Sequence, residues 1–537
     1  MKMTIRNPGI YLPVILAIVL IAGIYIGFRL APISIYNNNL LPFKTEKYDK
    51  INDIINYIEQ EYVDSVTRHQ LTQDAIIGIL RNMDPHSQYI PSSKFDEVNE
   101  QLMGNFEGIG VQFRIEKDTI MVIHTIPGGP SEKVGIMAGD RIVNIDDTLV
   151  AGVKITNRQT VKKLKGKRGT KVDVGIFRRG IPELIDFAII RDVIPTYSID
   201  IAYMVDDSVG YIKLSKFSAT TYKEFVEAIR KLNDQGMTKL ILDLRGNAGG
   251  YLQASIQLAD EFLKEKQLIV YTVGNNRPKS YSYATRSGNL EDTEIVVLID
   301  EGSASASEII AGAIQDNDRG LIVGRRSFGK GLVQEQLNLP DGSALRLTVA
   351  RYYTPTGRCI QRPYDNGTEE YYSDLYERFT NGEISNADSI KFSDSLKFTT
   401  PCGKTVYGGG GIMPDVYVPL KTDKKASYFN KLMNNGLVFR YAFTYTDNHR
   451  NKLNKYQSFD DFNKNFFISR PFLEEFYKYA ENNGVKRDEN LDPYYEDKIK
   501  ILLKAFIGRN LFDDEGFYPI YHQTDEAFQE ALAILTD

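Results

Sequence analysis

Two apolar strand patterns in the chain each lead into a glycine-containing turn and then into a helical pattern. Lys239–Leu244 is almost entirely apolar and runs into a glycine-rich turn, and Glu294–Ile299 runs into a second turn at Gly302. A nearly continuous apolar run suits a strand that is buried on both faces of a sheet. Since alternation of such strands with helices is typical of an α/β core, residues 193–425 are predicted to form one.

Further elements of this core follow from hydrophobic periodicity. The predicted strands and helices are Val209–Phe217, Tyr222–Leu232, Leu252–Phe262, Ser305–Ile314 and Ser343–Tyr353.

Size and composition exclude several classes of protein. The chain has 537 residues, enough for several domains, with 42% apolar and 25% charged residues. Its formal charge of −5 gives no basic footprint for nucleic acid. With only Cys359 and Cys402, a disulfide framework and a four-thiolate zinc site are both excluded, and no other residues have convincing metal spacing. We therefore expect no metal and no cofactor.

The N-terminal residues 1–35 are predicted to be a membrane anchor. No charged residue occurs from Ile10 to Phe28, which approaches the length of about 20 residues that spans a bilayer as a helix. Lys2 and Arg6 precede it and favour a cytoplasmic N-terminus. A cleaved signal peptide is the alternative, although its apolar region is normally shorter. In either case the rest of the chain is expected outside the cytoplasm, in the single-pass case on the periplasmic side of the inner membrane.

Two further regions have helical patterns without a visible role. Residues 45–103 form a helical arm that is interrupted at Met83–Ser87, where a proline breaks the spacing. Residues 426–537 are rich in aromatic side chains, with helical spacing at Phe472, Phe476 and Tyr479, and are predicted to be a mainly helical extension of unknown role.

Residues 104–192 change to short β-type runs separated by glycine turns. They begin with Gly108-Ile109-Gly110-Val111 and end with the strand Lys171–Ile176. The order of these motifs resembles a PDZ domain, in which such a turn offers backbone N–H groups to a peptide's terminal carboxylate and the peptide adds as a strand. The resemblance implies that Gly108, Ile109, Gly110 and Val111 bind the peptide. An ordinary β-rich domain is the alternative.

The two turns of the α/β core are able to carry catalytic groups. Glycines in Arg245–Gly250 allow a sharp turn that exposes backbone N–H groups at a helix N-terminus, where they can stabilise an oxyanion. A phosphate cradle or a plain turn fits the same residues, whereas a Walker loop does not. Ser305 falls at the start of the next helix as an exposed nucleophile, with the N–H of Ala306 beside it, or as a helix cap. Taken alone, each segment fits the plain structural explanation better.

Lys330 is the candidate base for Ser305. Serine needs an adjacent base, and a desolvated lysine with a depressed pKa can act as one. Lys330 is flanked by Gly329 and Gly331, and the alternative is a surface lysine in a loop. Gln334 can orient the lysine through its side-chain carbonyl. No histidine stands near a candidate nucleophile in the sequence, so nothing supports a Ser-His-Asp triad; the five are His69, His86, His124, His449 and His522.

The order of these segments is similar to that in the carboxy-terminal processing peptidases, also called tail-specific proteases. The resemblance covers residues 45–420. After the PDZ-like region it rests on Leu244–Gly250, Gly302–Glu308, Ser327–Gln334, Tyr352–Arg358 and Gly410–Asp415.

This resemblance implies a core of the ClpP/crotonase type and a serine endopeptidase. Its residues would be Ser305 as nucleophile, Lys330 as general base and Gln334 as the group that orients the lysine. The backbone N–H of Ala306 and that of Gly249 or Gly250 would form the oxyanion hole. Ala248 replaces the proline common in this turn, which spares the glycines.

Two functions remain open from the sequence. The first is a membrane-anchored serine endopeptidase that recognises apolar C-terminal tails of proteins and cuts near them. The second is a non-enzymatic PDZ adaptor on an inactive hydrolase fold, which has no reason to keep Ser305, Lys330 and Gln334 together. Expected partners are protein substrates, the inner membrane, and a second copy of the chain or an adaptor protein.

Overall fold

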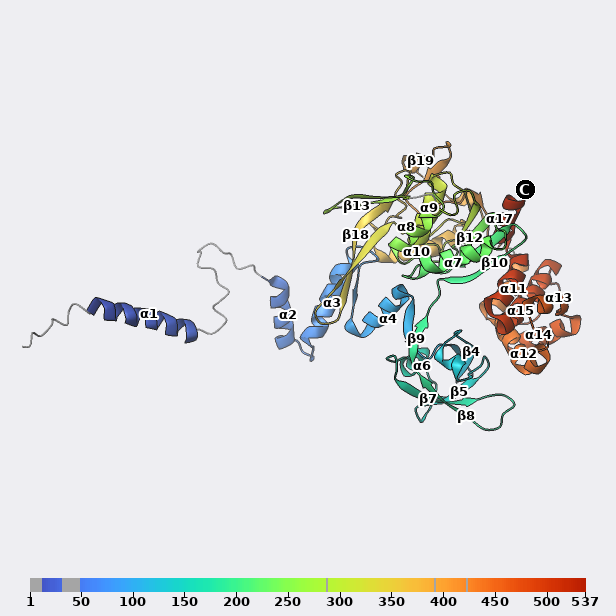
Figure 1. The fold of residues 1–537 in the computed structure, drawn as a ribbon, viewed down its shortest axis with the longest axis horizontal. Helices are drawn as coiled ribbons and strands as arrows, with labels where there is room; N and C mark the ends of the chain where they lie inside the picture. The colour runs from blue at the N-terminus through green and yellow to red at the C-terminus, as the bar shows by residue number, and fades with distance from the viewer. Residues whose placement is uncertain (1–11, 31–48, 286–287, 391–392, 422–423) are drawn as a thin grey trace, which may run out of the picture. The chain divides into compact units, whose positions relative to one another are not determined.

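The computed structural model describes residues 12–30, 49–285, 288–390, 393–421 and 424–537 (Figure 1). It divides into two compact units, residues 1–75 and residues 76–537. The first unit contains helices α1 (Leu12–Leu30) and α2 (Lys50–Glu61). Within the described ranges, the structure has no helix that combines the length and the apolar character needed to cross a membrane.

The PDZ-like region forms a β-rich body. Its six-stranded sheet runs in the order β3-β4-β5-β7-β8, with the short β6 beside β5. The chain enters through β2 (Asn105–Gly108) and leaves through β9 (Asp192–Pro195), which pair with each other in antiparallel fashion. The other elements are β3 (Val111–Glu116), β4 (Thr119–Thr125), α5 (Pro130–Lys133), β5 (Arg141–Ile145), β6 (Thr148–Leu149), α6 (Asn157–Leu164), β7 (Lys171–Phe177) and β8 (Ile185–Ile190).

The predicted α/β core contains a six-stranded sheet in the order β10-β11-β12-β15-β16-β21. Four of its five pairings are parallel, and only β10 with β11 is antiparallel. The strands are β10 (Ile199–Met204), β11 (Val209–Leu214), β12 (Lys239–Asp243), β15 (Glu294–Ile299), β16 (Leu321–Gly324) and β21 (Val416–Tyr417). The predicted strand at Glu294–Ile299 has the observed bounds, and the other predicted elements of the core differ by a few residues at their ends.

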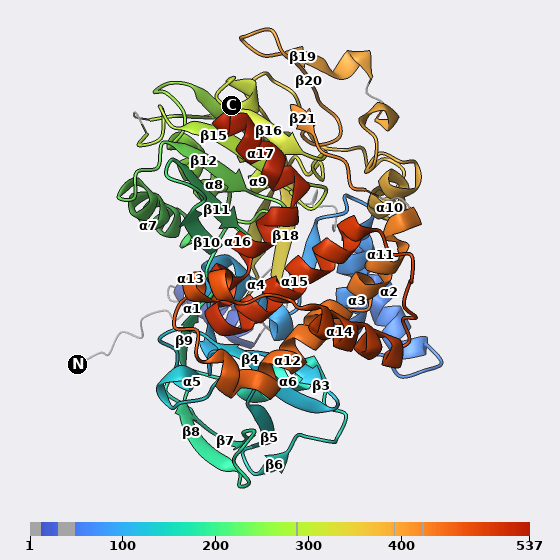
Figure 2. The same cartoon turned by 90° about the vertical axis from the view of Figure 1, so that its right-hand side faces the viewer.

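The two faces of this sheet are covered by helices from different parts of the chain. Alternate strand residues such as Leu240 and Leu242 pack against α7 (Thr221–Asn233), α8 (Leu252–Asp260) and α9 (Ala306–Asp316). The intervening residues, such as Ile241, pack against α17 (Glu526–Thr536) at the C-terminal end of the chain (Figure 2). The continuous apolar runs that predicted buried strands therefore have helices on both sides.

A second sheet lies beside the core, and β18 is the one of its five strands that the sequence predicted. Its order is β1-β18-β13-β14, and β17 also pairs with β18. The strands are β1 (Gln88–Ile90), β13 (Leu268–Gly274), β14 (Arg277–Tyr283), β17 (Leu332–Asn338) and β18 (Ala344–Tyr353). β1 lies in the segment predicted as a helical arm, directly after the predicted interruption at Met83–Ser87 and between α3 (Arg68–Arg81) and α4 (Ser92–Met103). Three residues are too few to show a strand period.

The C-terminal region is helical, as predicted, and has an aromatic core. Its helices are α11 (Ser427–Asn434), α12 (Leu437–Leu453), α13 (Phe459–Asn465), α14 (Arg470–Asn482), α15 (Pro493–Phe512) and α16 (Tyr518–Tyr521). Phe472 and Phe476 on α14 are buried against Tyr441 on α12. The chain then returns to the α/β core through α17, a connection that the aromatic spacing did not predict.

Candidate active site

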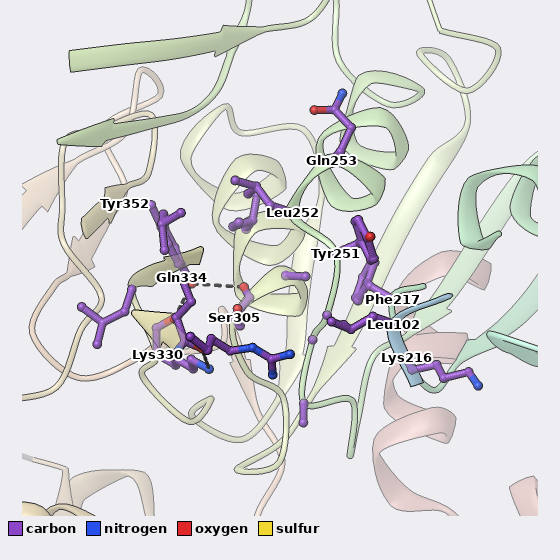
Figure 3. Close-up of a pocket in the computed structure, with 18 of the residues that line it drawn as sticks. Leu102, Lys216, Phe217, Tyr251, Leu252, Gln253, Ser305, Lys330, Gln334 and Tyr352 are labelled. Carbon is purple, nitrogen blue, oxygen red and sulfur yellow. Dashed lines mark hydrogen bonds between the residues drawn. The ribbon is translucent and has the colours of Figure 1, made fainter. Parts of the chain in front are cut away.

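A cavity of about 850 Å³ lies where β12 and β15 end. Its walls include the turn after β12 (residues 244–250, the glycine turn) and the end of the turn after β15 (residues 300–305, the serine turn). The side chains of Ser305, Lys330 and Gln334 lie together on one wall, and Leu102 and Phe217 lie across from them (Figure 3). The catalytic residues expected from the sequence therefore share one cavity.

Ser305 has a strained backbone conformation at the N-terminus of α9. Its φ is 56° and its ψ is −111°, a combination that residues with a side chain rarely adopt. Such strain costs on the order of 1–3 kcal/mol and persists only where the surroundings enforce it, most often at functional sites. The sharp strand-to-helix turn resembles the elbow that exposes the nucleophile in other hydrolases.

The carboxylate of Glu308 ties the serine turn to the loop that carries Lys330. This side chain is fully buried, and it accepts hydrogen bonds from the backbone N–H groups of Ser305 at 2.8 Å, Gly329 at 2.7 Å and Lys330 at 2.9 Å. It also accepts from the hydroxyl of Ser327. Burial raises the pKa of the Glu308 carboxyl. Glu308 was part of the sequence motif, but the sequence did not predict that it joins the serine turn to the loop of Lys330.

Tyr352 makes a second connection between the same two segments. Its hydroxyl donates to the carbonyl oxygens of Lys330 at 2.6 Å and Ser305 at 3.1 Å, and its ring is buried. Two buried side chains therefore fix the backbone of Ser305 relative to that of Lys330.

The lysine side chain is oriented by an amide. Lys330 Nζ donates to Gln334 Oε1 at 3.1 Å, and Gln334 Nε2 donates to the carbonyl oxygen of His86 at 2.6 Å. Because His86 can only accept at that oxygen, the amide of Gln334 must present its own oxygen to the lysine. This backbone acceptor lies in Met83–Ser87, the segment that interrupts the helical pattern and whose purpose was not visible in the sequence.

The surroundings of Lys330 favour its neutral form. Burial lowers the pKa of the Lys330 amine, and the positive charge of Arg346 lowers it further, while Glu308 and Asp84 act in the opposite direction. Arg346 comes from β18 and lines the same cavity. A neutral lysine can accept a proton, which a protonated lysine cannot.

The glycine turn is interlocked with the serine turn. The carbonyl oxygen of Asn247 accepts from the N–H of Ala304 at 3.0 Å and from the hydroxyl of Ser307 at 2.8 Å. The N–H of Gly246 donates to Asp300 Oδ1 at 2.8 Å. Gly249 approaches so closely that an added Cβ would lie 2.8 Å from Cβ of Ser305, so this position needs glycine.

Gly249 and Gly250 differ in their backbone donors. The N–H of Gly249 donates to Asn247 Oδ1 at 2.9 Å. Within the described part of the chain, no hydrogen bond is recorded from the N–H of Gly250 or from that of Ala306. Two backbone donors near Ser305 are therefore free to bind an oxygen that carries developing negative charge.

The predicted peptide-binding turn lies outside this cavity. Gly110 has a φ of 75°, and the carbonyl oxygen of Ile109 accepts from both the N–H and the hydroxyl of Ser131. β3, which begins at Val111, is an edge strand and pairs only with β4 among the described strands. β3 therefore has one unpaired edge, and peptides bind to sheets by adding as a strand to such an edge.

A metal site has no support in the described ranges, which contain no group of three His, Cys, Asp or Glu residues placed to hold an ion. Cys359 and Cys402 are both free thiols.

Three models of known protein families match this chain. Residues 208–369 match peptidase family S41, and residues 108–189 match a PDZ domain. Residues 428–513 match a family of unknown function. The first two matches cover the cavity and the β-rich body.

Relatives with established names are similar to this chain over more than half of its length. The carboxy-terminal-processing protease of Bartonella bacilliformis is 37% identical over 317 residues, which cover 58% of this chain and 72% of the relative. The carboxy-terminal processing protease CtpA of Bacillus subtilis is 33% identical, over 59% of this chain and 67% of the relative. The carboxyl-terminal-processing protease of a Picosynechococcus species is 34% identical, over 59% of this chain and 81% of the relative.

Proposed function

This chain belongs to the carboxy-terminal-processing proteases of peptidase family S41, and on that premise we propose that Ser305, Lys330 and Gln334 carry out the reaction. The chain is thus a serine protease with a PDZ domain. The observation that carries the assignment is the shared cavity, in which a strained serine lies with a half-buried lysine that donates to Gln334.

In the proposed reaction Lys330 acts as a general base and then as a general acid. Neutral Nζ accepts the proton of Ser305 Oγ as this oxygen attacks the carbonyl carbon of the scissile peptide bond. The protonated lysine then donates to the leaving amine. In the second half, a water molecule gives a proton to Lys330 as it attacks the acyl-enzyme. Lys330 then returns this proton to Ser305 Oγ as the ester bond breaks, which restores the free serine and the neutral lysine. Gln334 keeps the amine of Lys330 in position through both halves of the reaction but takes no part in proton transfer.

The oxyanion of each tetrahedral intermediate is assigned to the N–H groups of Ala306 and Gly250. Gly249 is the less suitable donor because its N–H is already bonded to Asn247. Gly249 instead supplies the close approach that brings the glycine turn against Ser305. The two free donors come from two different turns, so the oxyanion hole depends on how these turns are held together.

The PDZ domain is proposed to capture the C-terminal tail of the substrate. The Gly108–Val111 turn and the unpaired edge of β3 support this role. Amidating the C-terminus of a peptide removes the negative charge that the backbone donors of the turn bind. We therefore expect a lower specificity constant for an amidated peptide than for the free acid, and equal constants would leave this domain without the proposed role.

The proposal includes the N-terminal anchor and a catalytic part on the periplasmic side of the inner membrane. The support is the charge-free segment Ile10–Phe28 of the sequence. The proposed anchor is tested by washing membranes with alkaline carbonate, which leaves an anchored protein in the pellet and releases one that is not. Association with a second copy or an adaptor stays a prediction.

The main test is cleavage of an unstructured protein that ends in apolar residues. We expect Ser305→Ala and Lys330→Ala each to abolish cleavage, and the double variant to be no worse than either, because members of one catalytic unit are not additive. Gln334→Ala should be milder. Ser385→Ala, at an exposed serine, is the matched control and should leave the rate unchanged. Wild-type turnover by Ser305→Ala would show that the assignment is wrong.

A further inference from the structure

The glycine turn is attached to the C-terminal end of the chain by a buried ion pair. The guanidinium of Arg245 donates from Nη1 to Asp525 Oδ1 at 2.9 Å and from Nη2 to Asp525 Oδ2 at 2.7 Å. The two side chains are 17% and 5% exposed, respectively. Arg245 immediately precedes Gly246, whereas Asp525 lies 280 residues further along the chain. A residue outside the peptidase match therefore holds the first part of the glycine turn.

The ion pair belongs to a cluster that holds the backbone of Arg245 at both ends. The N–H of Arg245 donates to Asp243 Oδ1 at 2.9 Å, and its carbonyl oxygen accepts from Lys213 Nζ. The guanidinium also donates to both carboxylate oxygens of Asp243. Two carboxylates, Asp243 and Asp525, thus balance the two cations, Arg245 and Lys213. The position of this cluster determines where the following glycines lie.

Asp525 is placed by the packing of α17 on the sheet. Its side chain accepts from the N–H of Phe528 at 3.3 Å and so caps the helix. Phe528, Ala531 and Leu535 of α17 are buried against the sheet face that includes Tyr211. The models of known families match residues 108–189, 208–369 and 428–513, so no match includes Asp525.

A buried ion pair is a costly way to join two segments. The desolvation of both charges offsets most of their attraction, and apolar side chains of the same volume often stabilise a fold better. What a bidentate pair of arginine and carboxylate adds is a fixed geometry. Here the geometry is fixed next to backbone donors that must face Ser305.

We propose that Asp525 is a positioning residue for the oxyanion hole, acting through Arg245 on the N–H of Gly250. The proposal rests on the function assigned to the cavity above. Without the Asp525 carboxylate, Arg245 keeps only Asp243 on its own strand, and the glycine turn loses its attachment to α17. The turn can then shift relative to Ser305, which weakens the stabilisation of the transition state more than the binding of the ground state.

The test is Asp525→Asn, measured as kcat and KM for the unstructured substrate. Asparagine keeps the size of the side chain and is an equally good helix cap, so the change removes mainly the charge. We expect kcat to fall by about tenfold and KM to change by less than about twofold, a smaller loss than the roughly hundredfold that follows removal of an oxyanion donor. Asp525→Glu should recover part of kcat because it restores the charge.

Asp492→Asn is the matched control. Asp492 caps α15 in the same C-terminal region and pairs with Lys425, away from the cavity. It should leave kcat unchanged. An unchanged kcat in Asp525→Asn, or an equal fall in both variants, would overturn the proposal.

Two further measurements separate the possible causes. If Asp525→Asn does not fold, Arg245→Lys is measured instead, since lysine keeps the charge but cannot form the bidentate pair. A folded Arg245→Lys with lowered kcat supports the proposal, and one with unchanged kcat contradicts it. Failure of the wild type to cleave, or wild-type cleavage by Ser305→Ala, contradicts the function of the cavity itself.

Discussion

The serine turn presents a side chain to the cavity, whereas the glycine turn presents backbone. Both turns leave parallel strands at the same edge of the sheet and lead into helices. The serine turn is held by Glu308, which follows it directly, and by Tyr352, and both of these side chains also hold the loop of Lys330. The glycine turn lines the cavity with glycines and with the methyl group of Ala248, and its attachments include Asp525 near the C-terminal end of the chain.

In the proposed mechanism the two turns carry different catalytic functions, and each turn is stabilised in a different way. A side-chain nucleophile needs one strained residue and nearby hydrogen bonds that compensate for the strain. A backbone donor has no adjustable side chain, so its accuracy depends on every segment that fixes the turn. We therefore expect the glycine turn to be the more sensitive of the two to changes in the C-terminal region.

The largest expected effect is on the free energy of unfolding, and it comes from the packing of α17, whose N-cap residue is Asp525. Phe528 is 2% exposed and stacks on His522 with ring centroids 3.8 Å apart. Phe528→Ala should lower the free energy of unfolding by about 3–5 kcal/mol because it leaves a cavity beneath the helix. Phe467→Ala, at a ring that is 72% exposed, should change it by less than about 0.5 kcal/mol. Urea unfolding measures both, and similar values would mean that α17 is not part of the core.

The second largest effect is on kcat/KM, and it should differ between two glycines of the same turn. A Cβ at Gly250 would lie 1.9 Å from the carbonyl oxygen of Phe217, so Gly250→Ala must displace the turn. We expect kcat/KM to fall by about 10²–10³, as after loss of an oxyanion donor. A Cβ at Gly246 meets nothing within 4 Å, so Gly246→Ala adds only the strain of its positive φ, about 1–2 kcal/mol. Comparable losses of activity in the two variants would contradict the role of Gly250.

The smallest effect concerns the base that serves the serine turn. Since the charge of Arg346 lowers the pKa of Lys330, Arg346→Gln should raise that pKa. In the proposed mechanism the neutral lysine is the active form, so activity rises with pH through this pKa, and the rise should move to higher pH in the variant. The pH dependence of kcat/KM measures this shift. Arg351→Gln, on the same strand but bonded to Tyr364, is the control and should leave the profile in place.

The parts of the site that could be predicted are those that depend on short sequence motifs of neighbouring residues. Apolar strands followed by glycine turns indicated the core, and Ser305, Lys330 and Gln334 stand in motifs whose residue types suggest their chemistry. The strained φ of Ser305 was not visible, because serine also caps helices in ordinary conformations. The helix cap and the nucleophile use the same residue at the same position.

The parts that could not be predicted depend on contacts between distant segments. The carbonyl of His86 orients Gln334 from a position 248 residues earlier. Because every residue has a backbone carbonyl, the residue type at this position does not reveal the contact. Asp525 looks in the sequence like one more helix cap. Only the packing of α17 on the sheet brings it to Arg245.

The most direct test of the catalytic assignment is labelling with a fluorophosphonate, which reacts with activated serines. In the wild type we expect one adduct per chain, located by mass spectrometry on the peptide that contains Ser305. Ser305→Ala should take up no label, and Lys330→Ala should react far more slowly because the base is missing. Labelling of another serine with Ser305 unmodified, or wild-type labelling of Lys330→Ala, would contradict the account.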